Sequence, residues 1–408
     1  MLDIIKNNTV FLGKYRTNSE AVIISCFFNP QGSEYRNKAF KIFYDSIKHL
    51  PHRIIECVIG DSEPVLPESE NIKRVYTKSL LWHKEALLNN IIDNLPSKYK
   101  YIFWVDADVV FTNKNWLVDG VKQLKTKKII QPFEYCVHLE RDETEPSFDL
   151  SDVLDKNKLT PNSVNKRVWR SFCANYSDSS LWTSEVYNDH GHVGFAWGAR
   201  RSVLQQVPLY DKALVGGADH IIAHAATGHI AHNCIIKSFT DDIDSIRDWS
   251  RAFYYVVQGE IGYVEGNLYH IWHGDVEKRE YLKRVKEFTG KSKSIVDKDE
   301  HGLYVANNDE DVYVKDYFRN REVTKDDGFL TSMAIGYLTD DALTGAMLGG
   351  NLSGAMLGDA LNNSDEQSVE FGGGEFGGAG AGGTWEPSSQ GDNSADISSD
   401  DHNLSPFS

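Results

Sequence analysis

The chain has 408 residues, of which 41% are hydrophobic and 12% aromatic, so it can bury a large core in two or three domains. Residues 1–325 are almost neutral, with 45 acidic and 43 basic residues, whereas residues 326–408 hold 14 acidic residues and no lysine or arginine. The body therefore lacks the basic surplus of proteins that bind duplex nucleic acid, and no uncharged apolar stretch is long enough to span a bilayer.

Apolar runs alternate with segments of helical apolar spacing over the first third of the chain. The expected elements are a strand at 21–28, a helix at 35–50, a strand at 54–59, a short strand at 72–76, a helix at 81–92 and a strand at 101–113. This alternation predicts an α/β fold with a doubly wound, mostly parallel sheet and flanking helices.

The expected strand at 101–113 is an apolar run interrupted by Asp106 and Asp108. Residues two apart on a strand point the same way, and two unpaired carboxylates inside a core would cost too much. We therefore expect both at the carboxyl end of the strand, where open α/β sheets bind ligands and where Mg²⁺ or Mn²⁺ could carry a diphosphate. A solvated strand end with two incidental acids is the alternative, and the motif alone favours it.

The second half of the chain is less regular, especially over residues 131–180, which we expect to form a functional or mobile loop. Helices are expected near 202–207 and 221–227, a short strand within 266–275 and a basic helix at 277–288.

Three features of the chain carry possible chemistry. His270 and His273 are three apart beside a turn and can reach one ion, although two such histidines are more often structural. Gly216 and Gly217 allow close backbone approach to a ligand and place Asp219 at a helix start, where it could equally be an N-cap. Lys84 could face a phosphate, or simply be solvated.

The composition changes after residue 325. The segment 326–362 repeats Gly-Ala-Met-Leu-Gly at 345–349 and 354–358, which favours self-association or docking through small residues. A membrane-inserting hairpin is the alternative, and Asp340, Asp341 and Asp359 weigh against it. Residues 363–408 are rich in glycine, serine and acids and are expected to be disordered.

Six segments occur in an order that resembles glycosyltransferases of the GT-A fold, nearest to the β-1,4-galactosyltransferase-like group and its bacterial and phage relatives. They are Val22-Ile-Ile, Lys84-Glu-Ala-Leu-Leu-Asn89, Asp106-Ala-Asp108, Gly194-Phe-Ala-Trp-Gly-Ala-Arg-Arg201, Gly216-Gly-Ala-Asp219 and His270-Ile-Trp-His273. The resemblance covers roughly residues 20–320, so residues 1–325 are expected to be the catalytic domain.

The resemblance implies a role for each of these motifs. Asp108, His270 and His273 would bind Mn²⁺ or Mg²⁺, Asp106 would contact both the metal and the sugar nucleotide, and Asp219 would be the catalytic base. The family has a glutamate before this base and the chain has Ala218, which leaves the acceptor open. Seven residues are expected to bind the donor: Lys84, Asp106, Trp197, Gly216, Gly217, Lys278 and Arg279.

The expected function is transfer of a sugar, with inversion, from a nucleotide sugar (a UDP-sugar first) to a hydroxyl of a glycan or lipid-linked precursor. The competing interpretations are a phage-type transferase for modified DNA bases, which the neutral body disfavours, and a non-catalytic binding protein with a degenerate transferase domain. Five cysteines without Cys-x-x-Cys spacing and no visible signal peptide favour the cytoplasm of a bacterium or phage-infected cell, with or without membrane association.

Overall fold

The computed structural model describes residues 14–67, 69–150, 167–178, 190–236, 239, 243–274 and 297–305. The expected basic helix at 277–288, with Lys278 and Arg279, lies outside these residues, as does the whole segment 326–408. Within the described ranges, no helix combines the length and apolar character needed to cross a membrane.

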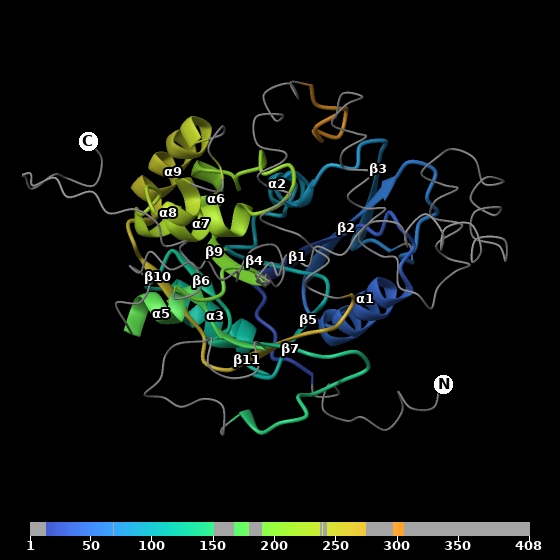
Figure 1. The fold of residues 1–408 in the computed structure, drawn as a ribbon, viewed down its shortest axis with the longest axis horizontal. Coiled ribbons are helices and arrows are strands. Elements are labelled where there is room, and N and C mark those ends of the chain that lie inside the picture. The colour runs from blue at the N-terminus through green and yellow to red at the C-terminus, as the bar shows by residue number, and fades with distance from the viewer. Residues whose placement is uncertain are drawn as a thin grey trace, which may run out of the picture.

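The main sheet has seven strands in the order β10-β6-β9-β4-β1-β2-β3 (Figure 1). They are β1 (Ala21–Phe27), β2 (His52–Ile59), β3 (Ile72–Thr77), β4 (Tyr101–Val105), β6 (Ile129–Gln131), β9 (Ala196–Arg200) and β10 (Ile261–Tyr263). Strands β4, β1, β2 and β3 run parallel, as do β6 and β10, whereas β9 is antiparallel to β4 and β6. The prediction of a mostly parallel α/β sheet is confirmed.

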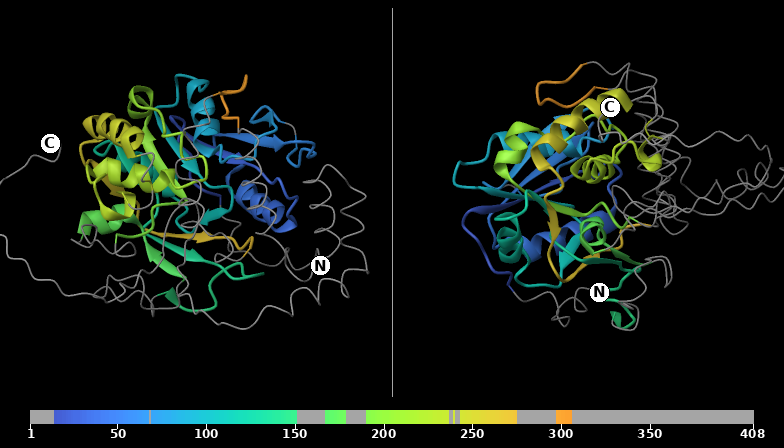
Figure 2. Two further views of the ribbon diagram at one scale, coloured as in Figure 1. Left: turned by 45° about the horizontal axis from the view of Figure 1, so that its top comes forward. Right: turned by 90° about the vertical axis from the view of Figure 1, so that its left-hand side faces the viewer.

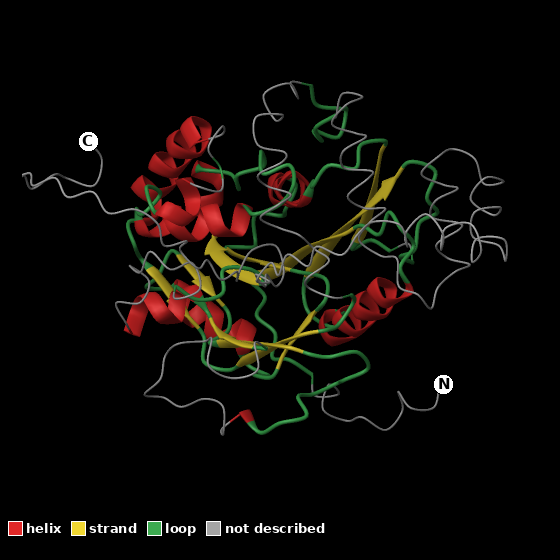
Figure 3. Cartoon of the chain, viewed as in Figure 1, coloured by secondary structure: helices red, strands yellow, loops and turns green. Residues whose placement is uncertain are grey.

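Helices cover both faces of this sheet (Figures 1 and 3). They are α1 (Glu34–Ile47), α2 (Lys84–Asp93), α3 (Trp116–Leu124), α5 (Phe172–Asp178), α6 (Arg201–Gln206), α7 (Ala218–Thr227), α8 (Asn233–Ile236) and α9 (Ile243–Val257). Helices α2, α6, α7 and α9 gather on one face, while α1 and α3 lie on the other (Figure 1).

Strand β1 shows how one apolar run organises both layers. Val22 and Ile24 pack in the core that contains α2, α7 and α9, whereas Ile23 and Phe27 pack in the core that contains α1 and α3. Because successive side chains of a strand point to opposite faces, an unbroken apolar strand holds helices on both sides.

The expected single strand at 101–113 is wrong in one respect, because it breaks into two strands that belong to different sheets. A second sheet has the order β5-β11-β7-β8 and consists of β5 (Val109–Phe111), β11 (Asn267–His270), β7 (Tyr135–His138) and β8 (Val168–Arg170). Figure 2 shows it beneath the main sheet. Residues 106–108 form the link between the two sheets, where carboxylates escape the cost of a continuous buried strand.

The described part of 131–180 is more regular than its polar sequence predicts. It contains the end of β6, together with β7, β8 and α5, and residues 151–166 and 179–180 lie outside the described ranges. The β-strands there are three or four residues long, too short to show a period of two.

Candidate metal and catalytic site

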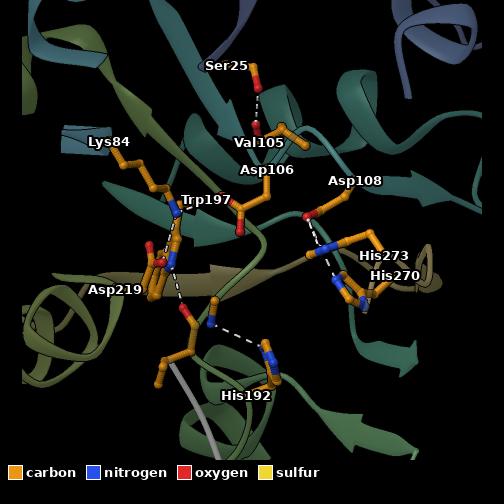
Figure 4. Close-up of polar contacts among 12 residues, drawn as sticks. Ser25, Lys84, Val105, Asp106, Asp108, His192, Trp197, Asp219, His270 and His273 are labelled. Carbon is orange, nitrogen blue, oxygen red and sulfur yellow. Dashed lines mark hydrogen bonds and ion pairs between the residues drawn. The ribbon is translucent and has the colours of Figure 1, made fainter. Parts of the chain in front are cut away.

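The site lies where the chain leaves the carboxyl end of β4 and crosses to the second sheet (Figure 4). Strand β11 pairs with β5 in antiparallel register, and this pairing places His270 opposite Val109, next to Asp108. The backbone N–H of Ile271 also donates to the carbonyl of Asp108 over 2.8 Å. Main-chain pairing thus brings together two motifs that lie about 160 residues apart in the sequence.

The side chains of Asp108, His270 and His273 converge as the sequence predicts. Asp108 Oδ2 lies 2.9 Å from His273 Nε2 and 3.8 Å from His270 Nε2, and the three candidate ligand atoms all lie within 4.8 Å of one another. Both histidines are buried, and Asp108 keeps a quarter of its side chain exposed. Its Oδ1 is buried and has no hydrogen-bond partner among the described residues. One carboxylate and two imidazoles with a spare oxygen fit Mn²⁺ or a similar cation.

Asp106 lies apart from these converging ligand atoms and faces Lys84 instead. Lys84 is the first residue of α2 and is only 5% exposed. Its Nζ lies 2.7 Å from Asp106 Oδ1 and 2.9 Å from Asp219 Oδ2 (Figure 4). The lysine expected to face a phosphate is therefore clamped between two carboxylates, and Asp106 is not part of the three-residue metal cluster.

The electrostatics of this buried trio follow from burial and mutual attraction. Burial acts to lower the pKa of Lys84, but the charges of Asp106 and Asp219 outweigh it and hold this pKa well above its usual value. Burial raises the pKa of Asp106 to about 7 and that of Asp219 in the same direction, while Lys84 opposes both shifts. The lysine therefore stays charged and keeps the carboxylates more ionised than burial alone would allow.

Glu85, the next residue of α2, is a buried acid that the sequence did not single out. It is 3% exposed, and burial raises its pKa to about 8, with Lys84 opposing and Asp219 adding to the shift. A Lys-Glu pair at a helix start usually lies in solvent, so nothing in the sequence marks this one as buried.

Helix α7 begins at Ala218, three residues before the start expected at Ile221, so Asp219 lies in its first turn. Gly216 and Gly217 precede the helix with φ of 94° and 98°, a conformation that glycine adopts without strain, and Gly217 is the N-cap. Asp219 is 1% exposed, and its Oδ1 has no hydrogen-bond partner within the described part of the chain. One carboxylate oxygen is thus held by Lys84 while the other remains an unused acceptor.

Phe195 directly precedes β9 and contacts both the link at residues 106–108 and one of the candidate metal ligands. Its carbonyl accepts the N–H of Asp106 over 2.7 Å, and its ring stacks between His192 and His270 at centroid distances of 4.2 and 4.9 Å. Its φ of 77° is unusual for a residue with a side chain, and such strain concentrates at functional sites. The Gly194–Arg201 motif therefore acts here through Phe195.

Trp197, which the sequence predicts to bind the donor, lies in the core of the main sheet. It is fully buried in β9, its ring lies 6.5 Å from that of Trp104, and its Nε1 donates to the carbonyl of Val193 over 2.8 Å. Its ring presents no face to a sugar, so the expectation that it contacts the donor is wrong in this conformation. Lys278 and Arg279 lie outside the described residues.

Comparison with known proteins adds little to this geometry. No family model and no curated protein matches the chain. Solved structures that align with it include mannosyl-3-phosphoglycerate synthase from Rubrobacter xylanophilus (11% identity, 68% of this chain and 74% of that one, TM-score 0.32). Others are glucosyl-3-phosphoglycerate synthase from Mycobacterium tuberculosis (11%, 71% and 83%, TM-score 0.31) and 4-diphosphocytidyl-2C-methyl-D-erythritol synthase from Anaerococcus prevotii (9%, 77% and 100%, TM-score 0.27). At these scores the likeness carries no argument about function.

Proposed function

We propose that the chain is a metal-dependent glycosyltransferase of the GT-A type that moves a sugar from a nucleotide-sugar donor to a hydroxyl acceptor. The observation that carries the proposal is the convergence of Asp108, His270 and His273 beside the buried Lys84–Asp106–Asp219 trio. A cation held at the carboxyl end of a parallel strand can offset the charge of a diphosphate leaving group. A nearby carboxylate can take the proton of a hydroxyl nucleophile.

In this proposal Asp108, His270 and His273 hold Mn²⁺ or Mg²⁺, which when bound offsets the negative charge of the leaving diphosphate. Lys84 orients Asp106, whose carboxylate contacts the donor sugar. The acceptor oxygen attacks the anomeric carbon with inversion as the bond to the diphosphate breaks. The acceptor proton passes to Asp219, for which Oδ1 is the available oxygen.

The remaining features of the proposal rest on the sequence alone. The donor is a UDP-sugar, with Gly216, Gly217, Lys278 and Arg279 near its diphosphate, and the acceptor is a glycan or lipid-linked precursor in the cytoplasm. Residues 1–325 form the catalytic domain, and the segment 326–362 mediates self-association ahead of the acidic tail.

A non-catalytic binding protein is a second candidate, and one observation favours it. Asp219 is only 1% exposed, although a base must touch the acceptor, and Ala218 stands where the resembling family has a glutamate. A transferase of this kind must therefore uncover Asp219 when substrates bind.

The test is release of nucleoside diphosphate from a panel of nucleotide sugars, with Mn²⁺ or with EDTA. The proposal expects slow metal-dependent hydrolysis of at least one donor, and loss of this activity in His273→Ala. The exposed Asp93→Ala, on the end of α2, is the control and should behave as the wild-type chain. Metal-dependent donor binding without any turnover would favour the binding protein, and absence of both would refute the proposal.

A further inference from the structure

A second group of metal-type ligands lies around Cys234, outside the site described above. It comprises His190, His220, His224 and Cys234, whose candidate ligand atoms all lie within 4.8 Å of one another. All four side chains are buried. His220 and His224 are four apart on α7, so they project from the same face of the helix.

The distances in this group match those imposed by a tetrahedral ion. Zn–N bonds of about 2.0 Å and a Zn–S bond of about 2.3 Å would place each ligand nitrogen roughly 3.5 Å from the sulfur. Cys234 Sγ lies 3.2 Å from His220 Nε2 and 3.3 Å from His224 Nε2.

The three imidazole rings satisfy the same geometry independently of the sulfur. Rings bound to one tetrahedral ion have their centroids about 5 Å apart. The observed centroid separations are 5.0 Å for His220 and His224, 5.2 Å for His190 and His220, and 5.0 Å for His190 and His224. Three mutually equidistant rings around one sulfur are not a feature that packing alone requires.

A reactive cysteine is a poor explanation for the cluster. A nucleophilic cysteine needs some exposure to solvent, whereas the Cys234 side chain is only 7% exposed. Four buried side chains that converge on one point are better explained as ligands of an ion.

We propose that His190, His220, His224 and Cys234 bind one Zn²⁺ as a closed, four-coordinate structural site. Soft thiolate and imidazole ligands select zinc, and four protein ligands leave no open position for a substrate. His232, whose Nδ1 lies 2.9 Å from Cys234 Sγ, supports the sulfur as a hydrogen-bonding neighbour. This proposal is independent of the proposed glycosyltransferase activity.

The site would tie together three separate segments of the chain. His190 precedes β9, His220 and His224 belong to α7, and Cys234 follows the turn at Gly228, where α7 ends with φ of 80°. His220 directly follows Asp219, so the ion would also fix the first turn of α7 and the position of that carboxylate.

Three measurements on the full wild-type chain test the site without any mutation. Elemental analysis after growth with zinc should find one tightly held zinc ion per chain, and zinc X-ray absorption should show about one sulfur and three nitrogens as nearest neighbours. Cobalt-exchanged protein should show a thiolate-to-cobalt charge-transfer band, which the Asp108–His270–His273 cluster cannot produce because it contains no cysteine.

Variants then locate the site. Cys234→Ser should abolish the charge-transfer band, whereas His229→Gln, at an exposed histidine of the same segment outside the cluster, should retain it. If Cys234→Ser does not fold, the sulfur and nitrogen count of the wild-type chain still decides. A folded wild-type chain that holds no zinc and gives no thiolate band would overturn the proposal. A band that persists in folded Cys234→Ser would also do so, and would move the site to the other thiol cluster, Cys136 with His138 and His192.

Discussion

Replacing Lys84 by methionine removes the cation that holds Asp106 and Asp219 together. Nζ lies 2.7 and 2.9 Å from the two carboxylates, and at an effective dielectric constant of about 20 each contact is worth roughly 6 kcal/mol before desolvation. Desolvation of the lysine offsets much of this, and an abandoned carboxylate can take up a proton. We therefore expect Lys84→Met to lower the free energy of unfolding by about 3–5 kcal/mol, the usual cost of breaking a buried ion pair.

The loss should depend on pH. Without Lys84, the folded-state pKa values of Asp106 and Asp219 rise further above their unfolded values. The stability that these two carboxyl groups contribute in the variant is then fully present below their unfolded pKa and is lost as pH rises towards their folded pKa. Urea unfolding of both proteins should show a larger deficit at pH 8 than at pH 5.

The same substitution at the exposed Lys73 of β3 is the control and should change stability by less than about 0.5 kcal/mol. Adding Asp219→Asn to Lys84→Met should recover part of the loss, because it removes one stranded carboxylate. A deficit below about 1 kcal/mol that is equal at both pH values would refute the ion-pair account.

Three further substitutions test separate parts of the structure. Asp219→Asn should lower turnover by about 10²–10⁴ while donor affinity survives, and near-normal turnover would reduce Asp219 to a structural residue. Burial raises the pKa of Glu85 to about 8, so the stability it contributes is present below its unfolded pKa and lost as pH rises through 8. Glu85→Gln should therefore melt close to the wild-type chain at pH 6 and above it at pH 9, and an unchanged difference would contradict its burial as a neutral acid. Gly198→Ala would place a Cβ 2.5 Å from the ring of Phe103 in the paired strand, so we expect a loss of about 1–3 kcal/mol in denaturant unfolding, and no loss would contradict this packing.

The main sheet was predictable where strands are long and apolar. The runs that became β1, β2 and β4 bury nearly every residue, so an unbroken apolar sequence was enough to identify them. In the second sheet, β11 matches the short strand expected within 266–275, but the sheet itself was not predictable, because β5, β7, β8 and β11 have only three or four residues each. The break of the expected strand 101–113 at Asp106 was not predictable either, since only the pairing of β5 with β11 shows that the chain changes sheets there.

The parts of the site that were predictable are those whose residues lie close together in the sequence. The spacing of His270 and His273 and the separation of Asp106 from Asp108 pointed to a shared cation, and the structure brings Asp108 and both histidines together. The contact between Lys84 and Asp219 spans 135 residues and has no local signature. The zinc-type cluster did leave a trace, in the four-residue spacing of His220 and His224 before Cys234, but His190 joins it only in three dimensions.

The most direct test of the account is nucleoside diphosphate binding measured by titration calorimetry on the full chain. UDP, GDP, CDP and dTDP are titrated with Mn²⁺ and with EDTA into the wild-type chain, Asp108→Ala and the control Asp93→Ala. We predict that at least one of the four binds to the wild-type chain and to Asp93→Ala in Mn²⁺. That binding should weaken by at least about 10-fold in EDTA or in folded Asp108→Ala, because the carboxylate is a proposed ligand of the ion. Affinity that is equal with and without Mn²⁺, or that survives intact in Asp108→Ala, would contradict the assignment of Asp108, His270 and His273 as the cation site.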